Sequence, residues 1–289
     1  MGGELLNPCV SLFAFSKILF PVDFSKHCEG AAQAVRAMAL EFQAEITALH
    51  VVEAASADST YEILVARARD LMDRLVADKL HGCTVCSHVE RGDPAQIIVS
   101  YARNGPFDLI MMPTHGYGPF RRFLLGSVTA KVLHDAACPV WTGAHLETWP
   151  PIETLGIRRV LAAVDLGPRS SGVLQLASQI ADKFQAKLTV AHVIPISSPF
   201  MEGYWIEDWR AETRKVIPEQ IRKLLPARCH PTEIEVLEGS PAPVLSEAAD
   251  RLHSDLLLIG RSHVTERVGQ LPAQAYAIIA RAPCPVISV

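Results

Sequence analysis

The sequence repeats itself, and this repeat constrains the fold more than any other feature. Residues 17–53 align without a gap to residues 159–195 and share about a dozen identical residues. The match resumes between residues 89–112 and 236–259, and again between the endings ACPVW and PCPVISV. Such self-similarity is typical of a duplicated structural unit. The chain has 289 residues, about twice the usual domain length of roughly 150. We therefore predict two domains, residues 1–150 and 151–289.

Each half alternates short apolar runs with longer segments of helical period. This order predicts strand-helix-strand units that build a parallel sheet. In the first half we expect strands at residues 17–22, 46–52, 84–90, 108–112 and 139–142. The fold class predicted is α/β, with two tandem Rossmann-like domains, each a five-stranded parallel sheet flanked by helices. The linker over residues 142–159 contains two adjacent prolines, which places the boundary near Pro151.

Helix starts and sheet edges give more local predictions. Asp93–Pro94 and Ser240–Pro241 each indicate an N-cap followed by proline at the first helical position. The final strand of each half should lie at a sheet edge, where unpaired backbone groups favour pairing with another strand. We expect the two edges to pair with each other and join the domains as a pseudo-dimer within the chain. The alternative is that each edge is short and capped by its neighbours.

Composition excludes several classes of partner. The net charge of −4 gives no positive field for nucleic acid. No apolar run reaches the roughly 18 to 20 residues of a membrane helix, and the first residues lack the layout of a secretory signal. The 7 cysteines are scattered, which favours reduced thiols over a disulfide framework. These features predict a cytoplasmic protein without nucleic-acid or membrane partners.

A C-x-x-C pair flanked by histidines, HGCTVCSH at residues 81–88, resembles a zinc-binding pattern. The pair leads into a predicted strand, where Cys86 and His88 share a face and Cys83 points elsewhere. A structural zinc knuckle places both cysteines at a turn, so we predict no metal site here.

The segment after the fourth strand is the candidate binding loop. It begins at Pro113, contains glycine, and leads into a helix that we expect to start near Gly126 and Ser127. In open parallel sheets, ligands bind beyond the carboxyl ends of the strands where the strand order reverses. Glycine allows close approach of a ligand, and the amides of a helix N-terminus attract anions. Phosphate binding and a tight structural turn both remain open on this pattern alone.

Four motifs together resemble the universal stress protein family: KILFPVDFS, ALHVVE, THG followed nine residues later by GS, and the ending CPV. The resemblance covers nearly the whole chain, twice. It implies an adenine nucleotide α hydrolase-like fold for each domain and ATP as the ligand, with Mg²⁺ left open. It also implies a binding set of Pro21, Val22, Asp23, Val51, Pro113, Thr114, His115, Gly116, Gly126, Ser127 and Val128.

The family's phosphate loop reads G-x-x-G, nine residues, then G-S or G-T, and Gly116, Gly126 and Ser127 fall on its last three positions. Pro113 replaces the first glycine, which removes one amide and fixes φ. The resemblance also implies that Asp23 reaches the ribose or adenine and that the backbone of Val51 meets the adenine edge. The structural alternatives are a helix cap for Asp23 and a buried strand position for Val51.

The second half departs from the loop motif. Aligning the endings places Pro272 and Ala273 opposite Gly126 and Ser127, and His263 opposite Gly116. Proline removes an amide, alanine removes the hydroxyl, and a Cβ blocks close approach of a ligand. We therefore predict that only the first domain binds phosphate and that the second is a structural or regulatory partner.

Three functions follow from these observations. The first is a nucleotide-dependent sensor or regulator of the stress response, with no catalytic residue. The second is an ATP-consuming enzyme, although the adenylation string S-G-G-x-D-S is absent from the sequence. The third is a scaffold in which Pro113 has closed the site. A homodimer in addition to the internal pseudo-dimer is left open.

Overall fold

The structure, a computed structural model, describes residues 15–53, 58–115, 125–143, 156–195, 204–227, 233–261 and 273–289. The first half contains β1 (Lys17–Pro21), α1 (Lys26–Phe42), β2 (Glu45–Glu53), α2 (Asp58–Lys79), β3 (Val85–Gly92), α3 (Pro94–Asn104), β4 (Leu109–Pro113), α4 (Ser127–Asp135) and β5 (Val140–Gly143). The second half repeats this order with β6 (Arg159–Ala163), α5 (Ser170–Phe184), β7 (Lys187–Ile194), α6 (Tyr204–Leu224), β8 (Glu233–Glu238), α7 (Pro241–Arg251), β9 (Leu256–Ile259), α8 (Ala273–Arg281) and β10 (Val286–Ser288). The predicted strands of the first half all form, within two residues of their expected ends.

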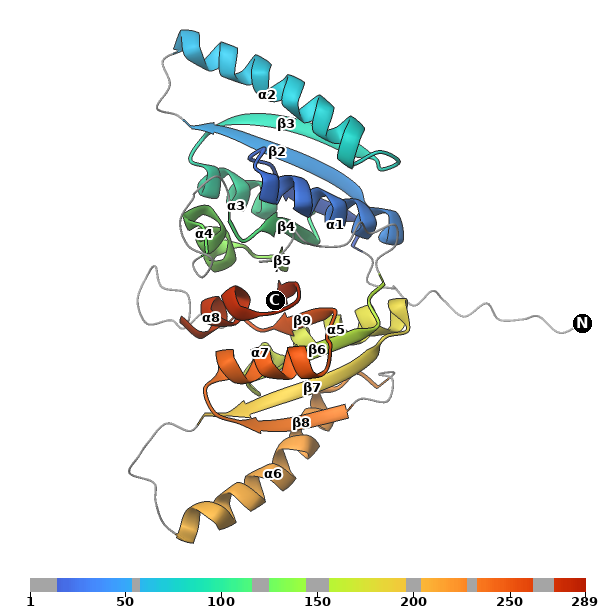
Figure 1. Ribbon diagram of the computed structural model, residues 1–289, viewed down its shortest axis with the longest axis vertical. Coiled ribbons are helices and arrows are strands. Elements are labelled where there is room, and N and C mark those ends of the chain that lie inside the picture. Colours follow the sequence, from blue (N-terminus) through green and yellow to red (C-terminus); the bar gives the residue numbers. More distant parts are fainter. Residues whose placement is uncertain are drawn as a thin grey trace, which may run out of the picture.

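The strands form one sheet of 10, in the order β3-β2-β1-β4-β5-β10-β9-β6-β7-β8. Pairing is parallel within each half and antiparallel between β5 and β10, where Trp141 lies opposite Ile287. Figure 1 shows the halves one above the other, with α2 and α6 at opposite ends. The prediction that the two final strands pair is confirmed, and the two five-stranded sheets are therefore continuous.

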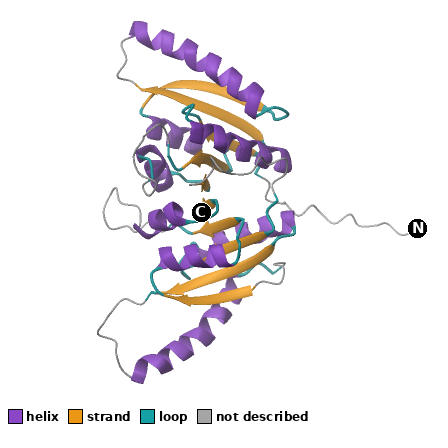
Figure 2. Cartoon of the chain, in the orientation of Figure 1, coloured by secondary structure: helices purple, strands orange, loops and turns teal. Residues whose placement is uncertain are grey.

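Helices cover both faces of the sheet (Figure 2). One hydrophobic core lies under α1, α2, α5 and α6, and the other lies under α3, α4, α7 and α8. Neighbouring residues of β1 alternate between them: Ile18 and Phe20 belong to the first core and Leu19 to the second. Because strand side chains alternate and both faces are covered, the strands read as continuous apolar runs. Each core runs through both halves.

The duplication extends to the backbone. Phe24 and Leu166, at aligned positions before α1 and α5, have positive φ angles of 61° and 63°. Gln43 and Gln185 end the same two helices in the left-handed conformation, with φ of 53° and 52°. Left-handed conformations are uncommon for residues other than glycine. Their recurrence at matched positions shows that the halves share loop geometry as well as elements.

Side chains add to the strand pairing at the junction of the halves. The rings of Phe42 and Phe184, at the ends of α1 and α5, pack edge to face with centroids 5.8 Å apart. Lys183 forms an ion pair with Glu41 at 3.3 Å. On the sheet, the Ser288 hydroxyl donates to the Val140 carbonyl at 3.3 Å. Together with the shared cores, these contacts make the halves one packed body.

Some of the sequence predictions concern residues outside the described ranges. These are the boundary near Pro151, the first fourteen residues, Pro272 and His263. The Cys86 thiol donates to the Glu45 carboxylate at 3.3 Å, and the Cys83 thiol donates to the Arg36 carbonyl at 3.8 Å. Within the described ranges, no three His, Cys, Asp or Glu residues are grouped to hold a metal ion. No helix in those ranges is both long and apolar enough to cross a membrane.

Candidate functional site

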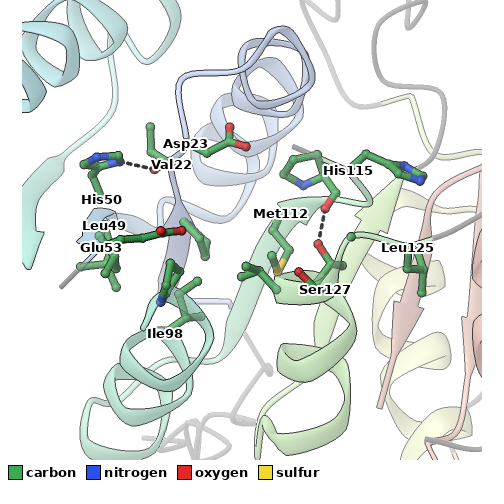
Figure 3. A pocket seen from close by; sticks show the side chains of 17 residues that line it. Val22, Asp23, Leu49, His50, Glu53, Ile98, Met112, His115, Leu125 and Ser127 are labelled. Carbon is green, nitrogen blue, oxygen red and sulfur yellow. Dashed lines mark hydrogen bonds between the residues drawn. The ribbon is translucent and has the colours of Figure 1, made fainter. Parts of the chain in front are cut away.

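A cavity of about 560 Å³ opens where β1, β2 and β4 end and α3 and α4 begin. The strand order reverses between β1 and β4, so the cavity lies at the switch point where open sheets bind ligands. Figure 3 shows its walls: Asp23, His50 and Glu53 come from the β1 and β2 side, and His115, Leu125 and Ser127 from the β4 and α4 side. The full lining is Pro21, Val22, Asp23, Leu49, His50, Val51, Glu53, Pro94, Ile98, Met112, Pro113, His115, Leu125, Gly126, Ser127, Val128 and Thr129.

The N-terminus of α4 supplies the cavity's hydrogen-bond donors. Helix α4 begins at Ser127 with Gly126 as N-cap, as the sequence predicts. The first amides of a helix have no acceptor within it, and Gly126 has no side chain that could accept from them. Its φ of −60° suits any residue, and an added Cβ would lie 3.4 Å from the nearest atom, the Thr114 carbonyl oxygen. The backbone therefore does not require glycine here, and its absent side chain leaves the first amides of α4 uncovered.

Hydrogen bonds from two buried threonines fix the end of β4 relative to α4 and β5. The Thr129 hydroxyl donates to the Pro113 carbonyl at 3.1 Å, and the Thr114 hydroxyl donates to the Gly143 carbonyl at 3.3 Å. The Gly126 amide donates to the Thr114 carbonyl at 2.8 Å. Pro113 lies at the cavity wall without filling it, and the pairing of β1 with β4 ends earlier, at Ile110. The backbone N–H that proline lacks would therefore lie beyond the last paired residue of β1 and β4.

Asp23 faces the cavity from the loop after β1. Its Oδ1 accepts from the Ser25 amide at 2.9 Å, and Oδ2 accepts from no described residue. The N-cap of α1 is Ser25, whose hydroxyl accepts from the Cys28 amide at 3.2 Å. The alternative that Asp23 caps this helix is therefore wrong. The half-buried carboxylate keeps an acceptor for a ligand hydroxyl.

The wall opposite α4 is mainly apolar. It is formed by the strand ends and by α3, and its side chains include those of Leu49, Val51, Ile98 and Met112. Val51 is half-buried, so the strand position offered as its structural alternative is also a cavity position. His50 is oriented by a hydrogen bond of 2.7 Å between Nδ1 and the Val22 carbonyl (Figure 3). This side of the cavity therefore offers an apolar surface.

His115 is the most electrostatically distinctive residue of the lining. Its Nδ1 lies 3.0 Å from the Thr114 hydroxyl, and its buried Nε2 has no hydrogen-bond partner among the described residues. Burial lowers the pKa of His115 from 6.5, and the charge of His27 lowers it further. The two rings are 6.3 Å apart. An unsatisfied buried nitrogen at a cavity wall is expected where a polar ligand binds.

Most of the predicted binding set lies together. The residues that line the cavity are Pro21, Val22, Asp23, Val51, Pro113, His115, Gly126, Ser127 and Val128. Thr114 is buried behind the wall instead, and Gly116 lies outside the described residues. The sequence prediction omitted Leu49, His50, Glu53, Pro94, Ile98, Met112, Leu125 and Thr129. The Asp93–Pro94 helix start was a usable signal for the α3 side, because α3 begins next to the ends of the strands.

The equivalent cavity of the second half is about 130 Å³ and is bordered by Asp165, Gly260 and Gln274. Its aspartate makes one more internal hydrogen bond than Asp23 does: Asp165 Oδ1 accepts from the Gly167 amide at 2.8 Å, as Asp23 Oδ1 accepts from Ser25, and also from the Ser170 hydroxyl at 3.1 Å. His192 contacts the Val164 carbonyl at 2.8 Å, as His50 contacts Val22. This histidine contact therefore belongs to the shared fold and does not mark a ligand.

Comparison with known proteins places both halves in one family. A family model described as the universal stress protein family matches residues 14–142 and again residues 156–289. Universal stress protein A homolog 1 of Coxiella burnetii is 30% identical over 139 residues, which cover 46% of this chain and 95% of that protein. A universal stress protein of Methanocaldococcus jannaschii is 31% identical over 137 residues, covering 44% of this chain and 80% of that protein.

The fold is also similar to that of a solved structure along nearly its whole length. A universal stress protein from Archaeoglobus fulgidus superposes with a TM-score of 0.71 at 22% identity, covering 96% of this chain and 98% of that chain. Two matches to one family model, each over a complete strand-helix unit, agree with the internal repeat and the ten-stranded sheet. The chain belongs to the universal stress protein family and carries two of its domains in tandem.

Proposed function

We propose that the first domain binds ATP and that the chain acts as a nucleotide-dependent regulator of the stress response. The carrying observation is the cavity of about 560 Å³ at the switch point, with the open N-terminus of α4 at one side. Ligand pockets commonly have volumes of about 300 to 1,000 Å³, are mostly apolar and contain a few directed polar groups. This cavity has those properties.

The two sides of the cavity suit the two ends of ATP. The amides of Ser127 and Val128 and the Ser127 hydroxyl face the phosphates, because a helix N-terminus favours anions. The adenine lies against Val51 and the apolar wall, and Asp23 accepts from a ribose hydroxyl. A divalent cation such as Mg²⁺ would neutralise part of the triphosphate charge; we assign no residue of the chain to it.

The interactions in such a site are strong enough to bind ATP in the cell. Hydrogen bonds to charged groups contribute about 1.5 to 3 kcal/mol each. Three or four of them, together with adenine burial, reach the roughly −8 kcal/mol that corresponds to micromolar binding. The scaffold alternative requires Pro113 to close the site, and the open cavity beside this residue disfavours it. Nucleotide occupancy then changes the packing of the first domain or the choice of partner.

The test is a thermal-shift and calorimetric titration with ATP and Mg²⁺. The wild-type chain should bind ATP with micromolar affinity and melt at a higher temperature with ligand, because ATP binds only the folded state. Gly126→Asp should weaken binding more than about 100-fold, or about 2.8 kcal/mol. The new carboxylate accepts from the same amides and repels phosphate, yet aspartate is a favourable N-cap, so the fold should persist.

Serine at the same position is the matched control. Gly126→Ser adds a favourable N-cap of similar size without a charge, so its loss of affinity should be smaller than that of aspartate. A wild-type chain that shows no shift at millimolar ATP would overturn the proposal.

A further inference from the structure

Arg261 is a buried cation that crosses the junction between the two halves. It follows β9 in the second domain, and only 2% of its surface is exposed. Its guanidinium donates to two carbonyls of the first domain, Leu133 at 2.9 Å and Cys138 at 2.7 Å. Its own backbone amide donates to Val289 at 2.8 Å, which fixes the base of the side chain beside β10. No carboxylate of a described residue forms an ion pair with it.

The Leu133 carbonyl belongs to the last turn of α4, the helix whose first turn borders the cavity. Carbonyls in the last turn have no amide partner within the helix, and a cation there complements the helix dipole. The second bond holds Cys138, between α4 and β5. Arg261 therefore holds the C-terminal end of α4, a helix of only nine residues. A short helix fixed at its C-terminus has little freedom to shift at its N-terminus.

Within the described part of the chain, the first half makes no equivalent contact to the second half at the aligned position. The first-half residue aligned with Arg261 is Thr114, whose hydroxyl bonds to Gly143 within its own domain. A threonine side chain is too short to reach across the junction as the arginine does. The domain with the smaller cavity thus holds the helix of the domain with the larger one, while its own α8 receives no such contact from Thr114.

We infer that Arg261 is a positioning residue through which the second domain fixes helix α4, and so sets the affinity of the first domain for phosphate. The inference rests on the proposed nucleotide site. It gives the second domain a role that its own cavity does not supply. Arg261 lines neither cavity, and its effect on the first one passes through the end of α4 and the turn that follows it.

The test compares ATP with adenosine, which lacks phosphates. In Arg261→Met, an unbranched apolar side chain of similar length replaces the arginine and donates no hydrogen bond to α4. ATP affinity should fall about tenfold, which equals about 1.4 kcal/mol, while adenosine affinity should stay within about twofold. Arg261→Lys keeps the charge with one compact donor group and should recover part of the loss. Amide hydrogen exchange in α4 should become faster in Arg261→Met.

Ser288→Ala is the matched control, because it removes a buried hydrogen bond across the same junction to β5 and not to α4. It should leave ATP affinity and exchange in α4 unchanged. Equal losses of ATP and adenosine affinity, or equal effects of Arg261→Met and Ser288→Ala, would show general destabilisation and overturn the inference. If the wild-type chain binds neither ligand, the proposed function fails. Exchange in α4 that Arg261→Met leaves unchanged overturns the positioning role itself.

Discussion

The two domains share strand order, helix order and even left-handed loop residues, yet their cavities measure about 560 and 130 Å³. The difference lies in how equivalent residues are used. In both domains the aspartate Oδ1 accepts from the amide two residues on, but Asp165 Oδ1 also accepts from the Ser170 hydroxyl, a second internal bond that Asp23 lacks among the described residues. Helix α4 begins after glycine, whereas the sequence places Pro272 before α8. A duplicated fold therefore does not carry a duplicated site, because function depends on local groups.

The same comparison explains which shared features are structural. The equivalent histidines of β2 and β7, His50 and His192, contact equivalent carbonyls in the two domains, at 2.7 and 2.8 Å. Because the contact persists where the cavity is small, it maintains the sheet end and says little about ligands. The features confined to the first domain are the better guide to its chemistry.

The largest effect expected within the comparison is at the paired aspartates. Asp23→Asn keeps an acceptor for the Ser25 amide but removes the charge that strengthens a ribose hydrogen bond. ATP affinity should fall about tenfold, or about 1.4 kcal/mol, by isothermal titration. Asp165→Asn should leave affinity within about twofold. If both variants weaken binding alike, the second domain takes part in binding and the two aspartates do not differ in function.

The next effect concerns the start of α3 and α7. Asp93 accepts from the Gln96 amide at 2.8 Å, whereas the equivalent Ser240 makes no capping hydrogen bond. Asp93→Ala should therefore lower the free energy of unfolding by about 1 kcal/mol. Ser240→Ala should lower it by less than about 0.5 kcal/mol. Urea unfolding at matched conditions measures both, and a larger loss at Ser240 would contradict the difference in capping.

The smallest effect is a pH dependence that only the first domain should show. Its cause is the lowered pKa of His115, and the aligned residue of the second half is Ser262. The unfolded chain binds this proton more tightly than the folded chain, so stability falls as pH decreases below the ordinary value of 6.5. NMR titration of the ring should give a pKa below 6.5, and ATP should raise it by favouring the protonated form.

The controls for this titration are chosen within the same domain. In Gly126→Asp, whose ATP affinity should be more than about 100-fold weaker, nucleotide at a concentration that saturates only the wild type should leave the His115 pKa unchanged. His115→Asn should show a weaker loss of melting temperature in acid than the wild type. A His115 pKa that does not respond to ATP in the wild type would place the phosphates away from this ring.

Much of the fold followed from local signals. Strand periods, the proline at the start of α3 and the glycine before α4 each act within a few residues, so the sequence displays them directly. The predicted binding set omitted several residues that line the cavity, and the reason is physical. Glu53, Ile98 and Met112 come from three elements that are distant in sequence, and only the packing of the sheet brings them to one cavity. The buried Thr114 hydroxyl bonds to the Gly143 carbonyl on β5, a contact between segments 29 residues apart that no local pattern displays.

The sequence by itself determined that the unit is duplicated, that each copy is α/β, and that one copy keeps the last three positions of the phosphate loop motif, because these follow from local residue types and their spacing. Only the tertiary structure decided that β5 and β10 join the copies into one sheet and that Arg261 reaches α4 across that junction. Contacts between residues 128 positions apart leave no periodic trace in the chain. They depend on how two packed domains meet.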